Sequence, residues 1–211
     1  MSELKQRKIE SPAIAGIVLA AGQSRRMGQP KMALAWGETT LVGQVVATLD
    51  QAGLAEICVV TGGDRSVVEQ AVKEIRVATP LEFAFNPAYR LDEMILSIQT
   101  GLAALSERID AALIALGDQP QMELATIESI LDVYKRQPAD LIVPSYRLRR
   151  GHPWLAGRKL WAAIQALEPP RNLRDFLNAY AEQICYINLE TESVLQDIDT
   201  PADYQRYRSA R

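Results

Sequence analysis

The amino-acid sequence predicts an α/β fold, with one mostly parallel sheet and helices on both of its faces. Short apolar, β-branched runs of the kind that form strands buried on both faces alternate with amphipathic helical patterns. Strands and helices that alternate at this spacing form parallel sheets with right-handed crossovers. The length of 211 residues suits one domain, and no internal repeat or linker divides the chain.

The alternation is clearest up to residue 144. The predicted strands are the apolar runs at 14–19, 56–61, 81–85, 111–116 and 140–144. The predicted helices occupy 39–52, a segment that begins after Asp64, 92–105 and 123–135. Thr39 or Thr40 can cap the first of these helices, and Gly53 can end it. The apolar positions of the second helix include Val67, Val68, Ala71 and Val72. In the third helix the residues expected to face inward are Met94, Ile95, Ile98 and Leu102.

Beyond residue 144 the regular pattern breaks. Residues 145–154 indicate a hairpin or an irregular loop, followed by helices at 159–167 and 172–181 and a strand at 184–189. Thr200 can cap a last helix that has Pro201 at its first position. Residues 1–12 are polar and lack the apolar run of a signal peptide. We therefore expect a flexible N-terminal tail at 1–12 and a single domain at 13–211.

Charge, cysteine and histidine content exclude several classes of function. The formal net charge is -3, which gives no electrostatic reason to expect binding to nucleic acid or a membrane surface. No run of ~20 apolar residues is present to cross a membrane. Cys58 and Cys185 lie in separate apolar segments, which predicts buried reduced thiols and a cytoplasmic protein. His152 is the single histidine, so any metal site must use oxygen ligands.

A loop rich in glycine and cations follows the first predicted strand. It spans residues 19–31 (LAAGQSRRMGQPK) and leaves the sheet at the carboxyl edge, where open α/β sheets bind ligands. Gly22 and Gly28 permit close approaches and unusual torsions. Three cations share the segment: Arg25, Arg26 and Lys31. The loop matches neither the Walker A motif nor the dinucleotide fingerprint. We interpret it as an oligophosphate site, the alternative being a plain turn with solvated basic residues.

Two acidic segments are candidates for a metal site. Asp118 follows the strand at 111–116, at the same sheet edge as the basic loop. A carboxylate there would repel a phosphate unless a hard cation lay between them, which favours Mg²⁺. Asp197 and Asp199 form a second acidic segment, and in an extended chain both side chains share one face. The alternative for each aspartate is that it caps a helix or orders a turn.

A second group of candidates follows residue 146. His152 can orient a substrate or hydrogen-bond a turn before Pro153. The arginines beside it are either a solvated charge run or a clamp for a second anionic substrate; they are Arg147, Arg149 and Arg150.

These motifs, taken together, resemble the molybdenum cofactor nucleotidyltransferases of the MobA/MocA type, especially their cytidylyltransferase branch. Residues 19–31 resemble the family's L-A-A-G-x-S-x-R-M-G-x-x-K loop, and 117–120 (GDQP) its metal-binding G-D-x-P. Residues 151–153, 172–174 and 197–201 resemble its G-H-P, N-x-R and D-I-D-T-P segments. The resemblance spans nearly the whole chain and implies a Rossmann-like three-layer α/β/α nucleotidyltransferase fold.

The resemblance also implies an activity and a set of site residues. The reaction is transfer of CMP from CTP to the terminal phosphate of molybdenum-molybdopterin, which releases pyrophosphate and forms molybdopterin cytosine dinucleotide. The nucleotide-binding residues that it implies are Leu19, Ala20, Ala21, Gly22, Ser24, Arg26 and Lys31. The implied catalytic residues are Arg26, Lys31 and Asp118. Asp118 and Asp199 are the implied ligands of the cofactor Mg²⁺. The implied acceptor pocket comprises Arg150 (or Arg147), His152, Asn172 and Arg174. An apo-molybdoenzyme is the implied recipient of the product.

Two positions bear on specificity within the family. Ala20 and Ala21 replace an adjacent pair of glycines, which favours cytidylyl over guanylyl transfer. Glu93 stands where the family usually has a glycine, so we expect it to narrow or re-charge one wall of the site. Three alternatives stay open: another small acceptor such as a sugar or alcohol phosphate, GTP as the donor, or a non-catalytic carrier of molybdenum cofactor.

Overall fold

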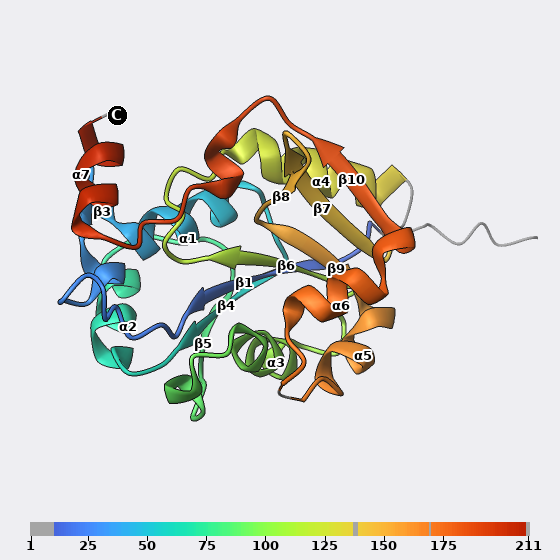
Figure 1. The fold of residues 1–211 in the computed structure, drawn as a ribbon, viewed down its shortest axis with the longest axis horizontal. Helices are drawn as coiled ribbons and strands as arrows, with labels where there is room; N and C mark the ends of the chain where they lie inside the picture. The colour runs from blue at the N-terminus through green and yellow to red at the C-terminus, as the bar shows by residue number, and fades with distance from the viewer. Residues whose placement is uncertain (1–10, 137–138, 169, 210–211) are drawn as a thin grey trace, which may run out of the picture.

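The computed structural model describes residues 11–136, 139–168 and 170–209. Only residues 11 and 12 of the predicted tail fall within this part of the chain. One sheet forms the middle layer (Figure 1), with strand order β10-β7-β9-β6-β1-β4-β5. The strands of this path are β1 (Ile14–Ala20), β4 (Glu56–Thr61), β5 (Leu81–Phe85), β6 (Ala111–Leu116), β7 (Leu141–Tyr146), β9 (Trp154–Gly157) and β10 (Ile184–Asn188). Along this path β9 alone runs antiparallel to its neighbours, so the predicted mostly parallel sheet is confirmed.

Helices cover both faces of the sheet, which confirms the three-layer α/β/α arrangement. They are α1 (Leu41–Gln51), α2 (Arg65–Lys73), α3 (Met94–Ala104), α4 (Leu124–Arg136), α5 (Trp161–Gln165), α6 (Leu173–Ala179) and α7 (Pro201–Ser209). One apolar cluster joins the sheet to α1, α2 and α4, with Val45 and Ile127 among its members. A second cluster on the opposite face includes Ile98 of α3 and Phe176 of α6. In Figure 1, α1 and α4 lie above the sheet, and α3 and α5 lie below it.

The ends of the helices follow the predicted capping residues. The Thr40 side chain accepts a hydrogen bond from the backbone N–H of Gly43 and caps α1. Gly53 follows the helix with φ +69°, a torsion that suits glycine. At α7 the Thr200 hydroxyl accepts from Asp203 N, while the Asp203 carboxylate accepts from Thr200 N. This reciprocal pair is a capping box, and it fixes where the last helix begins.

One residue predicted to face inward does not, and two other features differ from the sequence pattern. Met94 is 41% exposed, although it was expected to face inward, and Val67, an apolar position of the second helix, is 37% exposed. Val67 precedes the buried Val68 by one position, and neighbouring helical residues point in different directions. Met94 is the first residue of α3 and borders a cavity. β9 consists of Trp154, predicted as the end of the hairpin or irregular loop, and residues 155–157, for which no element was predicted; it lies between β6 and β7.

The hairpin predicted after residue 144 is present. β8 (Arg149–Arg150) pairs antiparallel with β7. The two residues at the tip, Arg147 and Leu148, have φ of 48° and 65°. Positive φ at both central positions is the geometry that matches the twist of a tight hairpin. Arg149 and Arg150 therefore lie beside the last two residues of β7 and run antiparallel to them.

The C-terminal segment returns to the N-terminal half of the chain. Tyr204 and Ile198 are buried in a small cluster with Met27, Trp36 and Leu41. The Tyr204 hydroxyl donates to the carbonyl of Ala35 at 2.6 Å. The backbone N–H of Ile198 donates to the carbonyl of Asp118 at 3.0 Å. These contacts bring residues 197–199 against both the glycine-rich loop and the end of β6.

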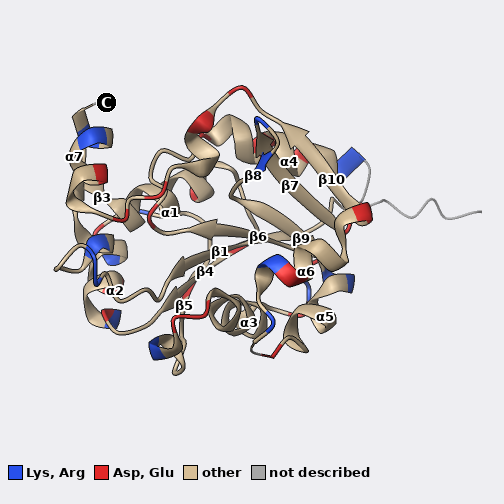
Figure 2. Cartoon of the chain, viewed as in Figure 1, with Lys and Arg blue, Asp and Glu red and all other residues tan. Residues whose placement is uncertain are grey.

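Charged residues of both signs are interspersed over the ribbon (Figure 2). Within the described ranges no helix is long and apolar enough to cross a bilayer. Cys58 and Cys185 are free thiols. Cys58 is 2% exposed, and burial, with the nearby carboxylates of Glu82 and Glu56, raises its pKa to about 12. Cys185 is only partly buried, so the prediction of two buried thiols holds fully for Cys58 alone.

Candidate active site

The glycine-rich loop is held in shape by its own hydrogen bonds. Ser24, with φ of 50°, uses its carbonyl to accept from the backbone N–H groups of Met27 and Gly28. Its hydroxyl accepts from the backbone N–H of Lys31 at 3.0 Å. Gly28 has φ +70°, so the predicted need for glycine torsional freedom is met there. Ser24 thus orders the loop and directs Lys31 back toward the sheet.

A compact charged cluster forms where the loop meets the carboxyl edge of the sheet. The Lys31 ammonium donates to Asp118 and, at 2.9 Å, to Oδ1 of Asp199. Arg26 pairs with Oδ2 of Asp199 at 2.8 Å. The Lys31 side chain is 10% exposed and that of Arg26 is 69% exposed. Burial disfavours the charged ammonium of Lys31, but the two carboxylates outweigh burial and raise its pKa above the ordinary value.

The two carboxylates fit a hard cation. Oxygens of Asp118 and Asp199 converge on one ammonium group, so both reach a single position suited to a positive charge. In the described part of the chain, no group of three or more His, Cys, Asp or Glu residues is arranged to hold a metal. Mg²⁺ binds through few protein carboxylates and takes its other ligands from water and phosphate. The donor set at Asp118 and Asp199 matches that preference.

Asp197 lies behind this cluster. Its Oδ1 accepts from Gln119 Nε2 at 2.5 Å, and it lines the same cavity as Asp199, as the alternation of an extended segment predicts. Burial raises the pKa of Asp197, and the charges of Asp118 and Asp199 raise it further. The hydrogen bond from Gln119 and the charge of Lys31 act in the opposite direction. The cluster therefore carries one carboxylate more than its two cations neutralise.

A cavity of about 330 Å³ opens beside the cluster. The predicted residues that line it are Leu19, Ala21, Gly22, Arg26, Lys31, Asp118 and Asp199. Ala20 does not line it, because this residue is 1% exposed and packs in the apolar cluster between the sheet and α1, α2 and α4. Ser24 does not line it either, since its hydroxyl orders the loop. A Cβ on Gly22 would meet no atom within 4 Å, so the missing side chain leaves open space on the cavity wall.

The opposite wall of this cavity contains residues that the sequence did not single out. They are Asn86, Tyr89, Asp92 and Ser97. Asn86 is 2% exposed; its Nδ2 donates to Ser97 Oγ at 3.0 Å and its Oδ1 accepts from Ala88 N at 2.9 Å. A Cβ on Gly62 would lie 2.9 Å from that of Tyr89, so this glycine lets the 86–91 segment approach the loop. The available signal was position, because Asn86 follows β5 at the carboxyl edge of the sheet.

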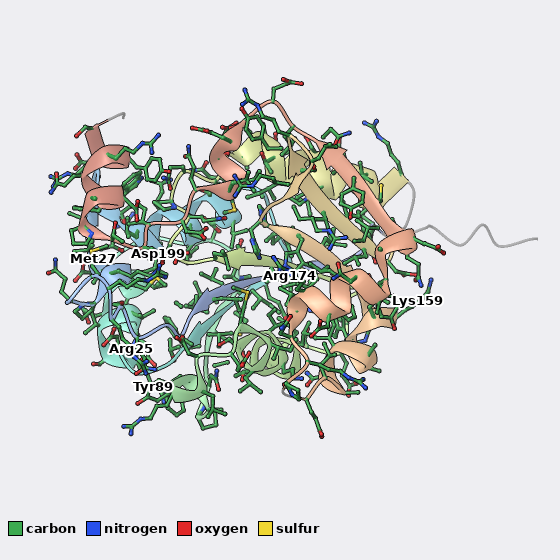
Figure 3. All side chains as sticks on the ribbon, viewed as in Figure 1. Arg25, Met27, Tyr89, Lys159, Arg174 and Asp199 are labelled. Carbon is green, nitrogen blue, oxygen red and sulfur yellow. The ribbon has the colours of Figure 1, made fainter. Side chains whose placement is uncertain are left out.

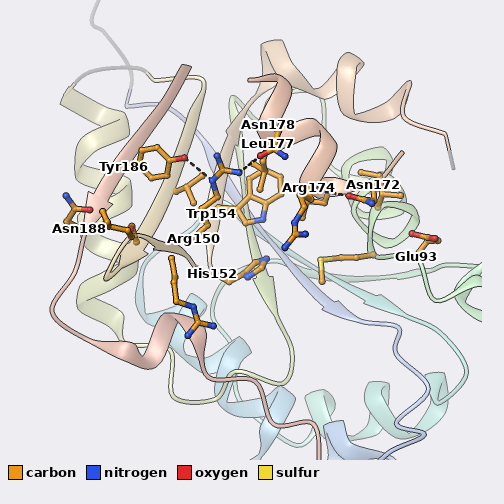
Figure 4. Close-up of a pocket in the computed structure, with 18 residues that line it drawn as sticks. Glu93, Arg150, His152, Trp154, Asn172, Arg174, Leu177, Asn178, Tyr186 and Asn188 are labelled. Carbon is orange, nitrogen blue, oxygen red and sulfur yellow. Dashed lines mark hydrogen bonds between the residues drawn. The ribbon is translucent and has the colours of Figure 1, made fainter. Parts of the chain in front are cut away.

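A second, larger cavity of about 1260 Å³ adjoins the first (Figure 4). All four predicted acceptor residues line it: Arg150, His152, Asn172 and Arg174. They come from the β7–β8 hairpin, the segment before β9 and the start of α6. Arg147 does not line it, because its guanidinium stacks on Tyr146 instead. Glu93 and Met94 line both cavities, so the start of α3 is their shared wall.

The polar side chains of the larger cavity are held to different degrees. Arg150 donates from Nε to the Tyr186 hydroxyl at 2.9 Å and from Nη1 to Asn178 Oδ1 at 3.0 Å. Asn172 caps α6, since its Oδ1 accepts from the backbone N–H groups of Arg174 and Asp175. The Arg174 guanidinium has no hydrogen-bond or ion-pair partner among the described residues, and Figure 4 shows it directed into the cavity. Arg174 lies near the centre of the molecule in Figure 3, between Asp199 on one side and Lys159 on the other.

His152 is fixed by its backbone and not by its ring. Its N–H donates to the carbonyl of Val194 at 2.9 Å. A Cβ on the preceding Gly151 would lie 2.7 Å from that of Val194, so only glycine permits this approach. The ring atom Nε2 is buried without a partner in the described structure. Burial lowers the pKa of His152 to about 4, so the imidazole is neutral at pH 7.

Comparison with known proteins finds relatives along most of the chain. Residues 16–184 match the family model described as the MobA-like NTP transferase domain. The molybdenum cofactor cytidylyltransferase of Escherichia coli (strain K12) is 26% identical over 193 residues, which cover 91% of this chain and 94% of that protein. Nicotine blue oxidoreductase of Paenarthrobacter nicotinovorans is 28% identical over 198 residues, which cover 90% of this chain and 93% of that protein.

Two solved structures are similar to this chain over most of its length. The crystal structure of Rv0371c from Mycobacterium tuberculosis H37Rv superposes with a TM-score of 0.79 at 26% identity and covers 93% of this chain and 98% of that chain. A complex of the same mycobacterial protein with manganese superposes with a TM-score of 0.76 at 26% identity, covering 94% and 99% of the two chains.

Proposed function

Because the chain belongs to the MobA-like NTP transferase family, we propose that it transfers CMP from CTP to the terminal phosphate of molybdenum-molybdopterin. Pyrophosphate is released, and molybdopterin cytosine dinucleotide is the product. The relative named molybdenum cofactor cytidylyltransferase matches this chain over most of both lengths, which supports the choice of donor and acceptor.

One observation supports the proposal: two cavities share a wall at the start of α3, and each is lined by the charged groups that one of the two substrates would need. The smaller cavity is lined by the cations Arg26 and Lys31, which can bind a triphosphate, and by the carboxylates of Asp118 and Asp199, which can bind its metal. The larger cavity presents Arg149, Arg150 and Arg174, as a second anionic substrate requires. Two substrates bound in adjoining cavities can bring their phosphates together at the shared wall.

The reaction does not require a covalent bond between the protein and either substrate. An oxygen of the acceptor phosphate attacks the α-phosphorus of CTP, and the bond from that phosphorus to the bridging oxygen of the β-phosphate breaks. Because the nucleophile is already an anionic oxygen, positioning and charge neutralisation are sufficient. Lys31 and Arg26 neutralise the β- and γ-phosphates that leave as pyrophosphate. For this, the Lys31 ammonium moves from the carboxylates toward the phosphates when the nucleotide binds.

Asp118 and Asp199 would hold Mg²⁺. The bound metal supplies neutralisation of the phosphate charge. The manganese complex of the mycobacterial relative supports the use of a divalent metal in this family. The acceptor phosphate is held by Arg174, whose guanidinium is not committed to any described residue, while Arg150 is already fixed by Tyr186 and Asn178.

The test is a screen of pyrophosphate release. The purified protein is given molybdenum-molybdopterin, Mg²⁺ or Mn²⁺, and each of the four NTPs in turn. We expect release with CTP, and Asp118→Asn should lower it at least 100-fold, because one of the two metal carboxylates is lost. The matched control is Asp132→Asn, which removes an exposed carboxylate on α4 whose ion-pair partner among the described residues is Arg136. No release with CTP, or equal losses in both variants, would overturn the proposal.

The same screen separates the alternatives. Release of pyrophosphate with GTP would identify a different donor. Release with a sugar or alcohol phosphate in place of the pterin would identify a different acceptor. In both cases the reaction is still a nucleotidyl transfer. A carrier of molybdenum cofactor would bind the pterin in the Asp118→Asn variant and release no pyrophosphate in any arm. Since one relative is named nicotine blue oxidoreductase, an arm that follows oxidation of NADH or NADPH tests for redox activity.

A further inference from the structure

Two ring nitrogens of residues that line the larger cavity have no hydrogen-bond partner in the part of the chain that the structure describes. Trp154 begins β9 and is 1% exposed, and its Nε1 is buried without a hydrogen bond in the described structure. Nε2 of His152, two residues earlier, is also buried without a hydrogen bond in the described structure. Both residues line the larger cavity and lie close together at its centre in Figure 4.

An unpaired buried donor is unusual and costly, because folding removes it from water without replacing the lost hydrogen bond. The neighbouring Trp161 shows the ordinary arrangement. It is 8% exposed, and its Nε1 donates to the carbonyl of Ala156 at 3.1 Å. The two indoles lie in the same apolar cluster. The difference is that Trp154 lines a cavity, where a ligand can supply the acceptor.

We propose that Trp154 and His152 recognise an uncharged hydrogen-bonding edge of the acceptor's heterocycle. A carbonyl oxygen or ring nitrogen of the ligand accepts from Trp154 Nε1–H, and an adjacent polar atom pairs with His152 Nε2. This inference rests on the proposed function for the assignment of the larger cavity to the acceptor. It deepens that assignment, because it separates residues that bind the ring from residues that bind the phosphate.

Charge supports this division of the cavity. Arg149 and Arg174 are exposed, whereas Trp154 is 1% exposed. The Trp154 indole is uncharged at any pH, and the low pKa of His152 keeps its imidazole uncharged at pH 7. Neither ring supplies a counter-charge to a phosphate dianion, whereas a neutral heterocycle with a carbonyl and ring N–H groups would pair with both nitrogens.

The experiment compares Trp154→Phe with Trp161→Phe. Both substitutions shorten a buried indole, but only the first removes the unpartnered N–H. The probes are 6-hydroxymethylpterin, which has the ring and no phosphate, and CTP with Mg²⁺; dissociation constants are measured by calorimetry. Loss of one neutral hydrogen bond should weaken pterin binding by Trp154→Phe about 3- to 10-fold and leave CTP binding unchanged. Trp161→Phe should bind both probes as the wild type does, and its unfolding temperature should fall further than that of Trp154→Phe.

Equal pterin affinity in wild type and Trp154→Phe would overturn the inference, and so would an equal loss in Trp161→Phe or no pterin binding by the wild type. If Trp154→Phe does not fold, the dissociation constants of 6-hydroxymethylpterin for His152→Leu and His152→Gln are compared instead. The inference requires that His152→Leu weakens pterin binding more than His152→Gln does, because only glutamine can replace the hydrogen bond of the imidazole. Because the pterin probe carries no phosphate, these results do not depend on turnover. A protein that binds the pterin in this way yet releases no pyrophosphate would contradict only the proposed function.

Discussion

Replacing Lys31 with methionine tests the charged cluster directly. The substitution keeps an unbranched apolar side chain as far as Cε and removes the ammonium that separates Asp118 from Asp199. At 2.9 Å, the attraction between Lys31 Nζ and Asp199 Oδ1 is about 6 kcal/mol for an effective dielectric constant of 20. Desolvation offsets part of this, and removing one partner of a buried pair costs about 3–5 kcal/mol. In a domain of this size that loss lowers the unfolding temperature by about 6–20 °C.

The assay is thermal unfolding with and without Mg²⁺. In the Lys31→Met variant the two carboxylates lose the buried ammonium and retain Arg26, whose side chain is 69% exposed, as a counter-charge to Asp199, so Mg²⁺ should recover much of the lost stability. In the wild type, Mg²⁺ must displace the ammonium, and the gain should be smaller. The control is Lys159→Met, because Lys159 is 79% exposed and pairs with Asp140 at 3.4 Å. Exposed pairs contribute about 0–1 kcal/mol. The reasoning is refuted if the two variants unfold at the same temperature, or if Mg²⁺ shifts both equally.

Three further predictions concern single residues. Burial lowers the pKa of His152 to about 4 from its ordinary 6.5, so the unfolded chain binds the proton first as pH falls. Relative to His152→Gln, the wild type should lose up to about 3 kcal/mol between pH 6.5 and 4 in urea unfolding, and a constant difference would contradict this. Because burial raises the pKa of Cys58 to about 12, iodoacetamide at pH 8 should modify Cys185 well before Cys58, as mass spectrometry would show. In Gly101→Ala the new Cβ would lie 2.6 Å from Cγ2 of Ile17, which should cost about 1–3 kcal/mol in the same urea assay; unchanged stability would contradict the close packing of α3 on β1.

The part of the fold that could be predicted from the sequence is the part with a strong local signal. The strands β1 and β6 are buried along their whole length, so their residues form continuous apolar runs. β9 could not be predicted in the same way. It has four residues, it follows Pro153, and its place between β6 and β7 depends on pairing with strands far away in the chain. Nothing local distinguishes such a strand from a loop.

The candidate site also has a part with a local sequence signal and a part that depends on contacts between distant segments. Lys31, Asp118 and Asp199 stand beside turns at strand or helix ends, and their residue types predict their chemistry. The opposite wall depends on Asn86 and Tyr89, whose roles come from the approach of the 86–91 segment to the loop. Trp154 carries no signal at all in the sequence, because a buried tryptophan normally finds a partner for its N–H. Its unpaired state becomes visible only when the surrounding atoms are placed.

The return of the C-terminal segment to the N-terminal loop also has a consequence for biosynthesis. During translation Lys31 and Asp118 leave the ribosome first, and Asp199 follows roughly 80 residues after Asp118. Until then a nascent chain has one of the two carboxylates that converge on the lysine, and Ile198 and Tyr204 have not yet closed the cluster around Met27 and Trp36. A nascent chain that ends before Asp197 therefore cannot assemble the full charged cluster, and the proposed site for a metal-bound nucleotide forms only after Asp199 has left the ribosome.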